Sequence, residues 1–228
     1  MNLATLEQIS KGYSLSVPNL RVLLPRNHAG AIIGPKGQSV RQIQDSHNVF
    51  IQLCQVEGSS WGRIINIKGS PTQLSQAWYD CVQLLVAGYQ QYYEANGMYA
   101  NFLFPTELVE LLLLEGHLED MAMSSKTRIY VKYNQLMRST ERIVQIQTAG
   151  TDTSSLKCFE RAVYRLAELV EQNITISLSM PGTVFYTANL TDDITKYLQR
   201  DERDILFDYT EKVESAIKDN NTNDIDQA

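Results

Sequence analysis

The alternation of apolar and polar positions predicts a first segment that begins with a strand and two short helices. An extended run over residues 20–24 ends at Pro25, and a short helix over 28–33 leads into the four residues Gly34-Pro35-Lys36-Gly37. A second helix is predicted from Gln38 to about Ser46, with its apolar side chains on one face. The four residues therefore form a tight connection between two helices.

Two strands and a long helix complete this segment. Residues 49–54 and 63–68 alternate apolar and polar side chains, as half-buried strands do. The Gly- and Ser-containing stretch 56–62 between them is predicted to be a loop. Ser70-Pro71 begins a helix, because proline suits the first helical turn. Apolar residues recur along this helix every three or four positions: Leu74, Trp78, Cys81, Leu85 and Tyr89.

A second segment repeats this order roughly 80 residues later. Its predicted elements are a strand over 101–104 that ends at Pro105, helices over 106–114 and 118–124, strands over 127–133 and 142–148, and a helix over 154–171. One order repeated at this spacing indicates two copies of a domain and not a solenoid. The Gln- and Tyr-rich stretch 88–97 is the predicted junction. Its neighbouring tyrosines fit either packing or a stacking platform for bases: Tyr89, Tyr92, Tyr93 and Tyr99.

The rest of the chain predicts a third region with a different pattern. Residues 174–180 and 183–187 resemble short strands around Pro181-Gly182, and from Thr191 the pattern becomes helical. One apolar stripe then repeats every four residues: Ile205, Tyr209, Val213 and Ile217. The stripe fits a helix that folds back on the second segment equally well as a helix that binds another chain. The last ten residues, 219–228, are predicted to be disordered.

Charge is distributed unevenly along the chain. The net charge is −6, and residues 183–228 hold 11 acidic and five basic side chains, so the rest of the chain is neutral. Residues 20–70 are locally basic, with two acidic side chains (Asp45, Glu57) against six basic ones: Arg21, Arg26, Lys36, Arg41, Arg63 and Lys68. A local basic surface can bind a short nucleic acid in a salt-sensitive way. Composition therefore permits RNA binding without indicating it.

Several classes of protein are disfavoured. Cys54, Cys81 and Cys158 lie far apart, form no metal-binding spacing and are expected to be reduced thiols. No apolar stretch approaches the ~20 residues that span a bilayer, and the N-terminus lacks the features of a secretory signal. We therefore expect a cytoplasmic or nuclear protein. No catalytic set of side chains stands out, so neither an enzyme nor a cofactor is expected.

The connection Gly34-Pro35-Lys36-Gly37 carries the main chemical signal. Glycine allows the chain to turn tightly and lets another backbone approach closely. The following helix begins there, and its exposed N–H groups and positive dipole end favour phosphate. Lys36 adds a positive charge at the tip. The turn is suited to a nucleic-acid backbone that passes over it.

The same residues resemble a known family. The run from Ile32 through Gly34-Pro35-Lys36-Gly37 to Ile43, together with the strands 50–53 and 63–69, is similar to the type I KH domain, in particular to its poly(C)-binding, hnRNP K and Nova groups. The resemblance implies an α+β fold of two type I KH domains. Each would have the order β-α-α-β-β-α, with a three-stranded antiparallel sheet backed by three helices. The expected regions are an N-terminal segment (1–18), a first KH domain (19–96), a degenerate second one (97–173), a C-terminal extension with an amphipathic helix (174–218) and an acidic tail (219–228).

The family implies a binding site for single-stranded RNA. Its GxxG loop clamps about four nucleotides by their backbone, and the bases lie in a narrow apolar groove. Bases would pair with the strand backbone near Leu53, and Arg63 matches an arginine that reads a pyrimidine edge in the poly(C) group. Carried over by position, the RNA-binding residues are Gly30, Ala31, Ile33, Gly34, Pro35, Lys36, Gly37, Val40, Arg41, Phe50, Ile51, Leu53 and Arg63.

Two positions depart from the family pattern. Phe50 stands where the poly(C) group commonly has a second arginine, and its ring fits either stacking on a base, for ~1–3 kcal/mol, or covering the core. Pro35 replaces a residue that is often basic, and it removes one N–H group and one charge. We therefore expect weaker phosphate contact than a loop with two lysines provides.

The second segment resembles a KH domain in outline only. Matching its strand with the first segment places residues 112–115 at the loop, and matching Pro105 with Pro25 places 114–117 there. Either register lacks both glycines and puts Glu115 in the loop, where a carboxylate repels phosphate. This unit is predicted not to hold RNA through its loop.

Two functions remain in view. The first is RNA binding by the first unit within a regulator of mRNA or pre-mRNA, with the second unit and the extension orienting it or recruiting partners. The alternative is a scaffold protein that uses both units and the C-terminal helix for protein contact or dimerisation.

Overall fold

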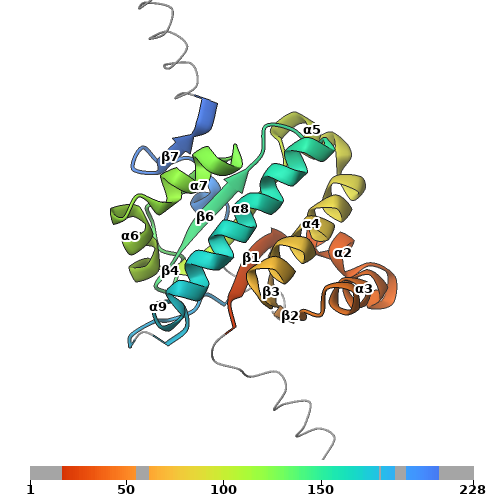
Figure 1. The fold of residues 1–228 in the computed structure, drawn as a ribbon, viewed down its shortest axis with the longest axis horizontal. Helices are drawn as coiled ribbons and strands as arrows, with labels where there is room; N and C mark the ends of the chain where they lie inside the picture. The colour runs from red at the N-terminus through yellow and green to blue at the C-terminus, as the bar shows by residue number, and fades with distance from the viewer. Residues whose placement is uncertain (1–16, 55–61, 180, 188–193, 211–228) are drawn as a thin grey trace, which may run out of the picture.

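The computed structural model describes residues 17–54, 62–179, 181–187 and 194–210 (Figure 1). The first unit has three strands, with two helices between the first and second strands and one long helix at its end. Its elements are β1 (Asn19–Pro25), α2 (Arg26–Ile33), a 3₁₀ turn η1 (Pro35–Gly37), α3 (Gln38–His47), β2 (Phe50–Cys54), β3 (Gly62–Lys68) and α4 (Pro71–Gly88). The predicted loop over 56–62 lies outside the described residues up to Trp61, and Gly62 already belongs to β3.

The second unit has the same order of elements, as the sequence pattern predicts. It consists of β4 (Tyr99–Pro105), α6 (Thr106–Leu114), α7 (His117–Ser125), β5 (Arg128–Val131), β6 (Glu141–Gln147) and α8 (Thr153–Gln172). The junction between the units is itself a short helix, α5 (Gln90–Asn96).

Local side-chain hydrogen bonds fix where the two long helices begin. Ser70 accepts a hydrogen bond from the Gln73 N–H, and the Gln73 side chain accepts one from the Ser70 N–H, so a capping box precedes Pro71. Asp152 accepts hydrogen bonds from two amides in the first turn of α8. Both starts are therefore encoded in a few adjacent residues.

The two units share one sheet, although the family resemblance led us to expect two separate three-stranded sheets. Its strand order is β2-β3-β1-β4-β6-β5-β7, and each of these strands is antiparallel to its neighbours. The units meet where β1 pairs with β4, with Val22 opposite Phe102. Pairing the two strands satisfies backbone groups that would otherwise form two open sheet edges. Outward from this junction, each unit has its first, third and second strands in that order, namely β1-β3-β2 and β4-β6-β5.

Apolar clusters pack on both faces of the sheet. Helices α4 and α8 pack side by side across one face (Figure 1), over a core that includes Trp78, Phe102 and Phe159. A smaller apolar cluster lies on the other face, where Leu23, Leu103 and Ile143 contact residues of the C-terminal extension. The buried extension residues in this cluster are Tyr186 and Ile194. The extension thus spans the junction of the two units.

The C-terminal extension differs from its prediction in three places. Residues 174–179 form a helix, α9 (Ile174–Ser179), because the Ser177 N–H bonds the Asn173 carbonyl and the chain continues to coil after α8. Residues 183–187 belong to no strand. Residues 205–208, expected in an amphipathic helix, form β7 (Ile205–Asp208), which pairs with β5.

The remaining part of the predicted helical region is short or undescribed. Helix α10 (Thr195–Leu198) has a single turn. Among the other stripe positions, Tyr209 follows β7 in a helical conformation, whereas Val213, Ile217 and the tail 219–228 lie outside the described residues. Residues 205–208 form a strand because they pair with the open edge of β5. The spacing of apolar residues along the chain does not reveal such a long-range pairing.

Candidate nucleic-acid interface

The connection between α2 and α3 is open to solvent. Pro35 and Lys36 are exposed, and neither the second unit nor the described part of the extension covers them. Gly34, Lys36 and Gly37 all have positive φ, of 70°, 51° and 76°. A Cβ on Gly34 would overlap Ser39 Oγ and lie 2.8 Å from Ser39 Cβ, so this position requires glycine. The turn is thus held in one tight conformation.

The amino end of α3 faces this turn without a neutralising side chain. Gly37 precedes the helix, no side chain caps it, and its first turn contains no acidic residue. The exposed side chains of Lys36 and Arg41 flank it and have no ion-pair partner among the described residues. Uncapped N–H groups beside two cations favour an anion such as a phosphate.

The predicted groove residues lie on the elements next to the turn. Gly30, Ala31 and Ile33 belong to α2, where Gly30 is exposed and a Cβ there would meet no atom within 4 Å. Val40 of α3 is almost fully buried. The α2 wall is therefore lined by small or apolar groups and has room beside Gly30.

The opposite wall comes from the edge of the sheet. Ile51 is buried in the main core and Leu53 packs against it, while Arg63 is partly exposed on β3. β2 is the outer strand of the sheet, and no described strand pairs with its free edge. Backbone groups near Leu53 are therefore open to a ligand.

Phe50 is not a core residue. Its side chain is 52% exposed, which excludes the interpretation that the ring covers the core. Because side chains alternate along a strand, Phe50 and Ile51 point to opposite faces of β2. A base would reach the ring only around the edge of the sheet.

One of the six basic residues counted near the motif does not contribute to this surface. The Arg21 guanidinium pairs with the buried Glu141 carboxylate of the second unit and donates a hydrogen bond to the Tyr186 carbonyl at 2.7 Å. It also lies over the Phe185 ring. Arg21 therefore joins the two units and the extension, a role that its charge alone did not indicate.

The corresponding turn of the second unit has different chemistry. Only Glu115 and Gly116 separate α6 from α7, and Gly116 has φ of 72° directly before α7, as Gly37 does before α3. This turn is two residues shorter than the turn 34–37 of the first unit. Both alignments considered from sequence assumed equal lengths, so they missed that Gly116 is the counterpart of Gly37. Leu114 at its tip is 87% exposed, and Glu115 pairs with His117 at 2.9 Å. The first turn of α7 adds Glu119 and Asp120, so this end of the second unit is acidic.

The edge of β5, which corresponds to the free edge of β2, is already occupied. β7 pairs with β5 from Arg128 opposite Asp208 to Val131 opposite Ile205. At one end of this pairing the Lys132 ammonium forms a buried ion pair with Asp204 at 2.7 Å. At the other end Arg128 pairs with Asp208, also at 2.7 Å. The extension thus fills the strand edge that remains open in the first unit.

Opposing effects act on the Asp204 carboxyl group. Burial alone would raise its pKa, but the Asp201 and Tyr133 N–H groups and the Lys132 ammonium donate to it. These donors hold the pKa of Asp204 below its ordinary value. The ion pair that anchors β7 is therefore charged at neutral pH.

An aromatic cluster lies where the first unit meets the junction helix. The His28 ring is 4.0 Å from the Tyr89 ring between centroids, and its Nδ1 is 2.8 Å from the Tyr93 hydroxyl. Tyr93 is fully buried, which supports the packing interpretation for this residue, whereas Tyr92 is 42% exposed. Burial lowers the pKa of His28. Sequence reasoning found the tyrosines but missed His28, whose apolar helix face was its only signal.

Further chemical features of the described residues are limited. In the described ranges, no group of three or more His, Cys, Asp or Glu side chains could hold a metal ion. None of the helices searched is both long and apolar enough to cross a membrane. All three cysteines are free thiols, and burial raises the pKa of Cys81.

Comparison with known proteins identifies one part of the chain. Residues 19–81 match the model of a family described as KH domain. The matched residues run from the first residue of β1 into α4, so they include the turn and both walls of the groove. No match to the chain was found among curated proteins.

Proposed function

We propose that the KH domain at residues 19–81 binds single-stranded RNA through the turn Gly34–Gly37 and the groove beside it, and that the protein acts in mRNA or pre-mRNA regulation. The KH match itself indicates RNA binding. The observation that carries the finer proposal is the exposed turn at an uncapped helix start, next to a free strand edge.

Each part of the site has a separate role in this proposal. The sugar-phosphate backbone lies against the glycine turn, where the N–H groups of α3 and the charges of Lys36 and Arg41 face its phosphates. The bases enter the groove between α2 and β2 and pair their edges with the backbone near Leu53. Arg63 provides a charged donor for a base edge. This division matches how KH domains hold about four nucleotides.

We infer that the second unit is a KH-like unit that does not bind RNA. Glu115 and the acidic first turn of α7 disfavour phosphate at its turn. β7 occupies the strand edge on which bases would pair. Both features support one RNA site per chain, and they support a structural role for the second unit.

Charge reversal in the turn tests this proposal. Fluorescence anisotropy with a degenerate single-stranded RNA library should show binding by the wild type and none by Lys36→Asp. The matched control is Lys126→Asp, because Lys126 is also exposed and has φ of 57° against 51° for Lys36. Lys132 is unsuitable as a control, since reversal there would break a buried ion pair.

Two outcomes would contradict the proposal. Equal binding by wild type and Lys36→Asp would remove the turn from the mechanism. Equal loss in Lys36→Asp and Lys126→Asp would indicate a general effect of net charge.

One part of the scaffold alternative is a C-terminal amphipathic helix, predicted from Thr191 onward and including Ile205, that contacts another chain. Residues 205–208 instead pair with β5 of the same chain. Light scattering on the full chain distinguishes the alternatives: a stable dimer without RNA affinity would favour the scaffold.

A further inference from the structure

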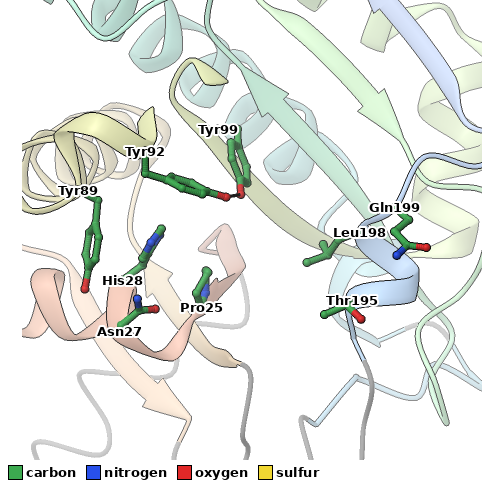
Figure 2. A pocket seen from close by; sticks show the side chains of 9 residues that line it. All are labelled: Pro25, Asn27, His28, Tyr89, Tyr92, Tyr99, Thr195, Leu198 and Gln199. Carbon is green, nitrogen blue, oxygen red and sulfur yellow. Dashed lines mark hydrogen bonds between the residues drawn. The ribbon is translucent and has the colours of Figure 1, made fainter. Parts of the chain in front are cut away.

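A pocket of about 560 Å³ lies between the first unit, the junction helix and the C-terminal extension (Figure 2). One side carries His28 with the tyrosines, and the C-terminal segment forms the opposite side. The lining residues are Pro25, Asn27, His28, Tyr89, Tyr92, Tyr99, Thr195, Leu198 and Gln199. Three regions far apart in sequence thus build one cavity.

The aromatic wall of this pocket is held in place. Tyr92 packs edge-on against the His28 ring, with centroids 5.2 Å apart, and its hydroxyl bonds that of Tyr99 (Figure 2). Tyr92 is nevertheless 42% exposed. Burial raises the pKa of Tyr99 and lowers that of His28, which favours the uncharged form of both side chains. The wall offers a fixed aromatic surface to a flat, neutral ring.

The polar groups at the pocket also suit such a ring. Asn27 and Gln199 are exposed, and their side-chain amides form no hydrogen bond with any described residue. A primary amide presents a donor and an acceptor together, which matches the edge of a nucleobase. Among the described residues that line the pocket, none is a lysine, an arginine or an acidic residue, so they offer no charged partner to a phosphate group or a cation.

The pocket adjoins the proposed RNA groove. Asn27 precedes Gly30 and Ala31 by three and four residues on α2, which places all three on adjacent positions of one helical turn. Tyr89 directly follows Gly88, where a Cβ would lie 3.4 Å from Ala31 Cβ. A strand that leaves the groove along α2 therefore arrives at the pocket.

We propose that this pocket binds one additional base of the RNA strand, stacked on Tyr92 and hydrogen-bonded by Asn27 and Gln199. This site rests on the proposed function of the first unit and extends its footprint beyond the groove. It would also make the C-terminal extension part of the RNA-binding surface, since Gln199 belongs to it.

The test compares two RNA lengths on the full-length protein. One RNA has four nucleotides, and the other has the same core with additional nucleotides on both sides. Tyr92→Ala should lower the affinity for the longer RNA about tenfold, as expected for the loss of one stacked base, and leave the short RNA unchanged. Tyr133→Ala is the matched control, because Tyr133 is 50% exposed and lies outside the pocket. Gln199→Ala should also weaken only the longer RNA.

A second measurement locates the stacked base. 2-Aminopurine placed in turn at each flanking nucleotide should be quenched at one position by the wild type and by Tyr92→Phe, and not by Tyr92→Ala. Wild-type affinities and quenching in Tyr92→Ala would overturn the pocket site. Equal weakening of both RNAs would overturn it too.

The outcomes separate this site from the proposed function. If Lys36→Asp abolishes binding while Tyr92→Ala changes nothing, the proposed function stands and the pocket site falls. If the wild type binds neither RNA, both proposals fall.

Discussion

At the scale of single residues, Gly30 combines a cost in stability with open space at the proposed site. A glycine inside a helix destabilises it by roughly 0.5–1 kcal/mol relative to alanine. Gly30 has no atom within 4 Å of the place where its Cβ would lie. The fold therefore does not require glycine there, whereas a ligand that lies close to α2 would.

Gly30→Leu separates these two effects. We expect an unchanged or higher free energy of unfolding, by up to about 1 kcal/mol, because leucine favours the helix and its Cβ would meet no neighbouring side chain or element within 4 Å. RNA affinity should fall at least about tenfold, or 1.4 kcal/mol, because the side chain fills the groove. Urea denaturation and anisotropy measure the two quantities. A variant with full RNA affinity would show that no bound strand passes Gly30.

His28 makes stability depend on pH. Burial lowers its pKa in the folded state below the value of about 6.5 in the unfolded chain. The folded state then binds fewer protons, so its stability is full above that value and is lost as the pH falls. The free energy of unfolding should decrease between about pH 7.5 and 5.5, and less so in His28→Gln. Parallel pH profiles of the two proteins would contradict this assignment.

At the scale of elements, local signals and long-range contacts determined different parts of the structure. The helix starts at Ser70 and Asp152 are capped by adjacent residues, so sequence could locate them. Residues 205–208 form too short an apolar run to distinguish helix from strand. Their conformation depends on the edge of β5, more than 70 residues earlier in the chain. The glycine turn was predictable because adjacent residues encode it. The pairing of β7 with the edge of β5 was not predictable, because it depends on residues far apart in the chain.

Two aspartates test how β7 is anchored. Asp204 forms a buried pair with Lys132, whereas Asp201 pairs with Arg203 at the surface. Asp204→Asn should lower the free energy of unfolding by about 3–5 kcal/mol, because it leaves a buried charge unpaired. Asp201→Asn should cost much less, because solvent screens an ion pair at the surface. Urea denaturation measures both, and similar small losses would show that the Lys132–Asp204 pair does not anchor the strand.

At the scale of the whole molecule, two units with the same order of elements differ at the turn between their short helices and at one strand edge. The sequence predicted both units, because each encodes its own periodicity. It did not predict that they share one sheet, since the pairing of β1 with β4 and the contact of Arg21 with Glu141 join residues far apart. The pocket at Tyr92 could not be predicted either, because its lining residues are also far apart in sequence. The first unit keeps an open turn and a free strand edge, while the second has an acidic turn and an occupied edge.

The most direct test of the proposal that only the first unit binds RNA is an amide-resolved NMR titration of the full chain with single-stranded RNA. We expect shifts concentrated in residues 34–41 and 51–53, with little change in residues 115–120 and 128–131. Shifts concentrated in the second unit, with residues 34–41 unchanged, would contradict it.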